Sequence, residues 1–105
     1  MKGDRLGEFE ELLLLAVRAT GDESYGVPVQ QYLEHATRRT VSMGAVYAAL
    51  DRLEYKGFVR SVMGEATAER GGKSKRLFSV TPAGMKVLRD VRRVRDRIWR
   101  AIEQG

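Results

Sequence analysis

The densest cluster of residues suited to chemistry is the segment A-E-R-G-G-K-S-K-R-L-F, residues 68–78. Its adjacent glycines and the following Lys73-Ser74 pair are the residue types with which nucleotide-binding loops hold phosphate groups. The same composition also suits a flexible linker, or the basic tip of a hairpin that contacts a polyanion. The flanking sequence has to separate these three interpretations.

A nucleotide-binding loop of this kind needs a glycine five residues before Gly72, with a strand before the loop and a helix after it. Thr67 occupies that position, and the residues after Ser74 have the pattern of a strand. A linker is also disfavoured, because strand-like segments flank the stretch closely. A hairpin tip remains, whose cations would neutralise phosphates. These cations are Arg70, Lys73, Lys75 and Arg76.

Catalytic and metal-binding residues are scarce. The chain has one histidine, His35, and no cysteine. A thiol nucleophile, a thiolate metal site and a histidine cluster within one chain are therefore excluded. No pair of carboxylates stands in an apolar setting that would favour acid–base catalysis. We expect that the protein is not an enzyme and binds no metal or cofactor. We assign His35 to a solvated or capping position.

Charge is distributed unevenly along the 105 residues, whose net charge is +5. Residues 1–36 carry 3 basic and 7 acidic side chains, residues 37–80 carry 9 and 4, and residues 81–105 carry 7 and 3. An acidic first part and a basic remainder favour a face that binds a polyanion over charge that only solvates helices. The longest apolar run, residues 12–17, is far short of a membrane span. With no signal-peptide layout, we expect a cytoplasmic protein without membrane association.

Hydrophobic periodicity predicts a mainly α protein with a small β-hairpin, an α+β fold. The first helix should be largely buried, because Leu14 and Leu15 widen its apolar stripe. Ser24, Ser42 and Thr81 are candidate N-caps, and Gly57 is placed to end the third helix. The predicted helices are 8–19, 27–36, 43–55 or 56, and 82–102, and the predicted strands are 58–63 and 77–80.

The second and third helices, with a short connection between them, form a helix-turn-helix layout. The outward face at the start of the third helix has almost no side chains beyond Cβ, with Gly44, Ala45 and Ala48. Such a face suits entry into the major groove, although small residues also let another helix pack closely. Ser42 and Tyr47 are then candidate donors to phosphates or base edges, and Arg52 a candidate backbone contact.

Three stretches together resemble the PadR family of bacterial transcriptional regulators. They are Tyr25-Gly26, S-M-G-A-V-Y-A-A-L-D-R-L-E-Y-K-G-F-V (42–59) and G-G-K-S-K-R-L-F-S-V-T-P-A-G (71–84). The sequence departs from the family where two aromatics often follow the basic run, because Leu77-Phe78 stand there.

The resemblance implies a winged helix-turn-helix homodimer that binds palindromic promoter DNA, usually as a repressor relieved by a small effector. It implies DNA contacts from the third helix and the wing, while Tyr25 would touch phosphate or serve the core. With the residues above, the expected DNA-binding set is Tyr25, Ser42, Gly44, Ala45, Tyr47, Arg52, Arg70, Lys73 and Lys75. A protein-interaction module with a winged-helix body is the alternative function.

The last helix carries apolar residues at heptad-like spacing, and it is long for so small a domain. We expect residues 81–105 to form a dimerisation helix behind a DNA-binding domain of residues 1–80. Its many arginines would solvate the other faces, although DNA binding is an alternative for them. The seam is Val87, Val91, Val94, Ile98 and Ala101, with Ile102 beside it.

Trp99, the only tryptophan, lies next to this seam. It either packs against the partner or the first helix, or lines a cleft at the dimer interface. In the second case Trp99 and Arg95 would hold a small planar aromatic effector by stacking.

Overall fold

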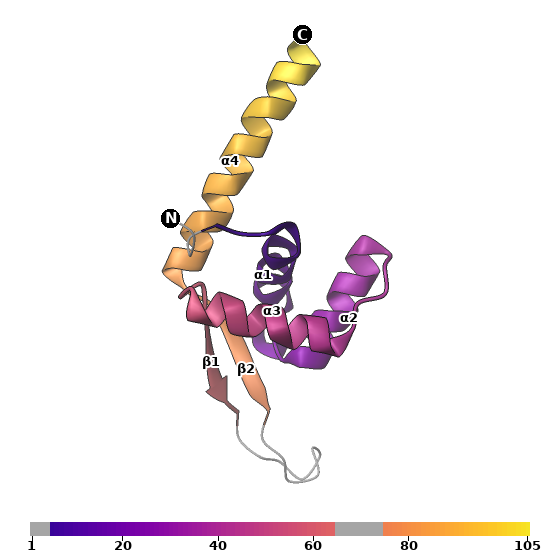
Figure 1. The fold of residues 1–105 in the computed structure, drawn as a ribbon, viewed down its shortest axis with the longest axis vertical. Helices are drawn as coiled ribbons and strands as arrows, with labels where there is room; N and C mark the ends of the chain where they lie inside the picture. The colour runs from indigo at the N-terminus through magenta and orange to yellow at the C-terminus, as the bar shows by residue number, and fades with distance from the viewer. Residues whose placement is uncertain (1–4, 65–74) are drawn as a thin grey trace.

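The computed structural model describes residues 5–64 and 75–105. Three helices pack together, a two-stranded hairpin extends below them, and a fourth helix extends away on the opposite side (Figure 1). The predicted α+β class is confirmed. The elements are α1 (Glu8–Thr20), a 3-10 turn (Gly21–Glu23), α2 (Gly26–Thr37), α3 (Met43–Tyr55), β1 (Val59–Met63), β2 (Arg76–Val80) and α4 (Pro82–Gln104).

Helix α1 supplies the centre of the core. Its inner face packs against α2, α3 and the hairpin, and burial of these apolar side chains drives the assembly. Leu14 is fully buried as expected, but the prediction for Leu15 is wrong: that side chain is 46% exposed. The largest fully buried side chains are Leu13, Leu14, Val17, Val29, Val46, Leu50 and Leu53.

Local signals set both ends of α3 and the start of α4. The Ser42 hydroxyl accepts a hydrogen bond from the amide of Ala45 at 3.1 Å, and Thr81 does the same for Gly84 at 3.0 Å. Gly57, at φ +82°, lets the Phe58 amide donate back to the carbonyl of Leu53 at 2.9 Å. A glycine at positive φ followed by such a bond is a common way to end a helix.

Ser24 does not cap α2, contrary to the sequence prediction. It is buried, its hydroxyl donates to the Phe78 carbonyl, and its own carbonyl accepts from the Phe78 amide at 2.9 Å. The N-cap position belongs to Tyr25, which makes no side-chain capping bond. The chain before α2 is therefore joined directly to β2.

The two strands are antiparallel, with Val59 opposite Val80 and Met63 opposite Arg76. The start of α4 packs tightly on their root, since a Cβ at Gly84 would lie 2.8 Å from Cγ1 of Val80 and against the Phe58 carbonyl. Helix α4 leaves the domain after Leu88, its last buried residue. The order of elements and the hairpin after α3 define a winged helix-turn-helix fold.

Candidate nucleic-acid interface

The outward face at the start of α3 is open. Ser42, Gly44, Ala45 and Ala48 are all exposed, and a Cβ at Gly44 would meet no atom within 4 Å. Within the part of the chain that the structure describes, no helix packs on these small residues. Gly44 also costs about 1 kcal/mol of helix stability relative to alanine. Among the described residues, nothing therefore supports the packing explanation for the small residues, which favours approach by an external partner.

Tyr47 lies over the start of α2. A Cβ at Gly26 would lie 2.7 Å from Cζ of Tyr47 and 2.8 Å from Cε of Met43, so only glycine admits this arrangement. Tyr47 remains 41% exposed, and its hydroxyl lies at the amino end of α2. The fold thus explains why a glycine follows Tyr25.

Lys75 completes the same corner from the hairpin. Its Nζ lies 4.8 Å from the centroid of the half-buried Tyr25 ring, a distance at which the cation and the ring attract each other. Because Tyr25 does not cap α2, the first amides of that helix have no side-chain acceptor among the described residues. Two tyrosines and a lysine therefore surround a helix start whose partial charge is positive.

Two other predicted contacts, Arg70 and Lys73, lie outside the described residues. The sequence predicts Arg76 at the wing tip, and this prediction is wrong, because Arg76 lies in β2 opposite Met63. Its guanidinium is directed to α3, where Nη2 lies 2.6 Å from Oε1 of Glu54.

Arg52 does not lie beside the other predicted DNA-binding residues. It lies in the last turn of α3, where its Nε pairs with Oε2 of Glu10 at 3.2 Å. Lys56 Nζ lies 3.0 Å from Oε1 of the same carboxylate, which also accepts from the Gly7 amide. Burial raises the pKa of Glu10, but the bonds from Gly7, Lys56 and Arg52 outweigh it and hold that pKa below its ordinary value. Arg52 thus ties α3 to α1.

The predicted seam on α4 divides into two parts. Val87 and Val91 are half-buried near the domain, and Val87 packs on its core. Farther along, Val94 is 48% exposed and Ile98 is 55% exposed, and Ile102 is exposed as well. An apolar face of this kind, on a helix that extends from its domain, is typical of an interface between subunits.

A groove of about 560 Å³ runs between α1 and α4. Trp99 borders it and is 60% exposed, so the groove is partly aromatic. Arg95 also borders it, with Nη2 bonded to Oε1 of Glu11 at 2.8 Å. The structure therefore brings the two predicted effector residues to one groove, together with Leu15 and Leu88.

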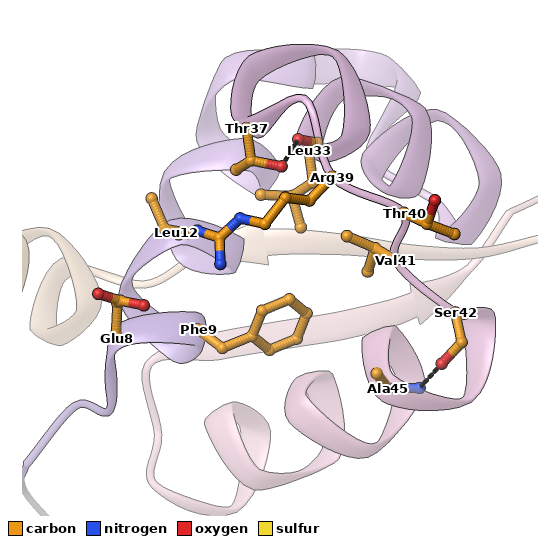
Figure 2. A pocket seen from close by; sticks show the side chains of 10 residues that line it. All are labelled: Glu8, Phe9, Leu12, Leu33, Thr37, Arg39, Thr40, Val41, Ser42 and Ala45. Carbon is orange, nitrogen blue, oxygen red and sulfur yellow. Dashed lines mark hydrogen bonds between the residues drawn. The ribbon is translucent and has the colours of Figure 1, made fainter.

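A second hollow, of about 490 Å³, lies between α1, the end of α2 and the start of α3. Figure 2 shows Arg39 extending over it toward Leu12, with the Phe9 ring facing the same space. Ser42 and Ala45 border it too, so it adjoins the open start of α3. The sequence does not predict this hollow or the exposed Arg39, because the lining comes from segments far apart in the chain.

Two other kinds of site are absent from residues 5–64 and 75–105. That part contains no group of three or more His, Cys, Asp or Glu side chains arranged to hold a metal ion. It also contains no helix that is both long and apolar enough to pass through a membrane.

The architecture and the open face of α3 define a winged-helix protein of the nucleic-acid-binding type. The model of the PadR-like family of transcriptional regulators matches residues 13–90, and the chain belongs to that family. It is a DNA-binding transcription regulator and not an enzyme. No curated protein matches the chain in sequence.

Solved structures of similar fold support the architecture. A PadR-like transcription factor from Bacteroides fragilis has a TM-score of 0.76 and 20% identity, over 91% of this chain and 87% of the other. A PadR-like regulator from Bacillus cereus has a TM-score of 0.72 and 17% identity, over 91% and 88%. A Streptococcus transcriptional regulator has a TM-score of 0.72 and 23% identity, over 91% and 89%. At these identities the likeness shows the fold.

Proposed function

We propose that the protein is a homodimeric repressor of the cytoplasm that binds palindromic promoter DNA. Helix α3 enters the major groove, and the wing follows the phosphate backbone. The observation that carries this proposal is the corner formed by Tyr25, Tyr47 and Lys75 at the uncapped start of α2, beside the open face of α3.

Each part of the corner suits a phosphate. Uncapped helix amides and a lysine attract the anion, and the two tyrosine hydroxyls can donate to its oxygens. Such a contact fixes the register of α3 in the groove, while Ser42, Gly44 and Ala45 approach the base edges. Arg70 and Lys73 of the wing, and more weakly Arg52, are proposed as further contacts with the backbone.

Dimerisation places two such units on one duplex. We assign residues 1–80 to the DNA-binding domain and residues 81–105 to the dimerisation helix, whose free apolar face is centred on Val94 and Ile98. A two-fold dimer matches a palindrome, because its half-sites are related by the same symmetry.

Lys75→Ala is expected to lower operator affinity by about tenfold and to reduce the salt slope by about two units per dimer, because each subunit loses one phosphate contact. Fluorescence anisotropy with labelled operator at several salt concentrations measures both quantities. Lys86→Ala is the matched control, since Lys86 is an exposed lysine on α4. Equal affinity and slope in Lys75→Ala and wild type would remove Lys75 from the interface.

We also propose that the groove beside Trp99 binds a small planar aromatic effector that releases DNA. The exposed indole offers a stacking face, and Leu15 and Leu88 supply an apolar wall. The arginines at the groove outnumber its two acids, which favours a ligand with negative charge. These arginines are Arg18, Arg89, Arg92 and Arg95.

Proflavine and anthracene-2-sulfonate, a cationic and an anionic planar dye, test this site. We expect quenching of Trp99 fluorescence, with the anionic dye binding more tightly. Calorimetry should show at least about tenfold weaker binding in Trp99→Leu, since a stacked aromatic pair and its buried area are lost. Phe9→Leu, in the other hollow, should bind like wild type. Absence of quenching by both dyes, or equal affinity in Trp99→Leu, contradicts the proposal.

A further inference from the structure

Arg76, the first residue of β2, makes a hydrogen bond within the fold from each of its three guanidinium nitrogens. Nη2 lies 2.6 Å from Oε1 of Glu54, Nη1 lies 3.3 Å from Oδ1 of Asp51, and Nε donates to Oγ of Ser61 at 3.2 Å. Ser61 in turn donates to Oε2 of Glu54 at 2.8 Å, which closes a ring of hydrogen bonds. The guanidinium carbon lies 4.9 Å from the centroid of the Phe78 ring.

This network joins three elements at the root of the wing. Glu54 and Asp51 lie on α3, Ser61 on β1 and Arg76 on β2. Directly beyond it, the Gly64 amide donates to the Lys75 carbonyl at 2.6 Å. The network therefore lies between the recognition helix and the strand ends that lead to Lys75.

The contacts are better suited to orientation than to global stability. Arg76, Glu54 and Asp51 are all partly exposed, and ion pairs in such settings stabilise a fold only weakly. The planar fork of arginine nevertheless fixes direction, because its donors have a set geometry. The hydrogen bond from Ser61, followed by that from Arg76, holds the pKa of Glu54 below its ordinary value, so this carboxylate is ionised at neutral pH.

We propose that Arg76 is a positioning residue that locks the wing to the recognition helix, and that it acts on DNA binding through this lock instead of through a phosphate contact. Arg76 also offsets two carboxylates on the helix that approaches the DNA. The inference rests on the proposed function, since the consequence of the lock is read in operator affinity.

Glu54→Gln separates the lock from a direct contact. If Arg76 contacted phosphate, removing a nearby negative charge would tighten binding and free the guanidinium. The lock predicts the opposite: affinity falls by about three- to tenfold, which lies in the lower part of the range of coupling between groups in one network. Ser61→Ala changes no charge and should weaken binding in the same direction.

The double variant Arg76→Ala/Glu54→Gln should be no weaker than Arg76→Ala alone, because both changes break one network. Lys86→Ala is again the control with unchanged affinity. Tighter or unchanged binding in both Glu54→Gln and Ser61→Ala overturns the proposal.

Amide hydrogen exchange of the free protein tests the lock without DNA. Arg76→Leu and Glu54→Gln should both raise exchange in β1 and β2, and leave α1 as protected as in wild type. Unchanged exchange in the strands overturns the lock. If wild type shifts no DNA while the strands respond as expected, the proposed function fails and the lock stands.

Discussion

Replacing Val94 and Ile98 with aspartate is expected to yield a monomer whose affinity for operator DNA is lower by at least about 100-fold, because the gain from linked binding of two half-sites is lost. Both side chains are about half exposed on α4. This helix extends away from the other three helices (Figure 1). Charges placed at the centre of an apolar interface are costly to bury without partners. Sedimentation equilibrium and operator titration measure the two effects.

Arg93→Asp/Arg100→Asp provides the control for this experiment. At helical spacing these positions lie away from the Val94 and Ile98 face, and both are exposed. The control should remain dimeric despite a larger change in charge. A dimer formed by the Val94→Asp/Ile98→Asp variant, or a monomer with wild-type affinity, would contradict the role of α4.

Gly26→Ala is expected to lower operator affinity on the order of 100-fold while the domain stays folded. The new Cβ would lie 2.7 Å from Cζ of Tyr47, so the ring must leave the start of α2. Hydrogen bonds to charged groups are worth about 1.5–3 kcal/mol each, and the dimer would lose two of them. The fold should survive, because the ring is partly exposed and alanine favours helix over glycine.

Gly7→Ala is the matched substitution, since its Cβ would make only an ordinary 3.6 Å contact with Glu10. Thermal melts and anisotropy titrations of both variants, beside Tyr47→Phe, identify the cause. Tyr47→Phe keeps the ring in place and removes only the hydroxyl, so it should lose part of the same affinity. Wild-type binding by Gly26→Ala would mean that Tyr47 does not contact DNA from this position.

Local features of the fold could be predicted from the sequence because their causes are local. Ser42 and Thr81 cap helices through residues three positions away, and Gly57 ends α3 through its own backbone angle. The hairpin followed from apolar strands on either side of a glycine-bearing segment. These signals need no knowledge of distant segments.

Two of the errors, those for Ser24 and Arg76, concern residues whose partners are distant in sequence. Ser24 is of a residue type that often caps helices, but its hydroxyl donates to the carbonyl of Phe78 on β2. Arg76 is a basic residue of the kind expected at a wing tip, but the carboxylates that it pairs with lie on α3. A charge pattern cannot reveal such pairings, because it does not say which carboxylates the fold brings near.

Part of the candidate site could be predicted from the sequence for the same reason, because some of its features are local. Ser42, Gly44 and Tyr47 share one short helix, so their common surface follows from helical geometry. The proximity of Lys75 to Tyr25 depends instead on the Ser24–Phe78 pairing, which only the folded chain shows. Gly26 is part of the sequence pattern that resembles the family. Its physical role is seen only in the folded chain, where Tyr47 occupies the space that a Cβ would need.

The most direct measurement is selection of genomic DNA fragments by the purified protein, followed by hydroxyl-radical footprinting of the enriched fragments. The proposal predicts one enriched sequence with two symmetric protected half-sites, separated by about 10 bp or a related spacing. Lys75→Ala should weaken protection at the flanking backbone of each half-site. Recovery of fragments without a shared sequence, or protection of one unpaired half-site, would contradict a dimeric, sequence-specific regulator.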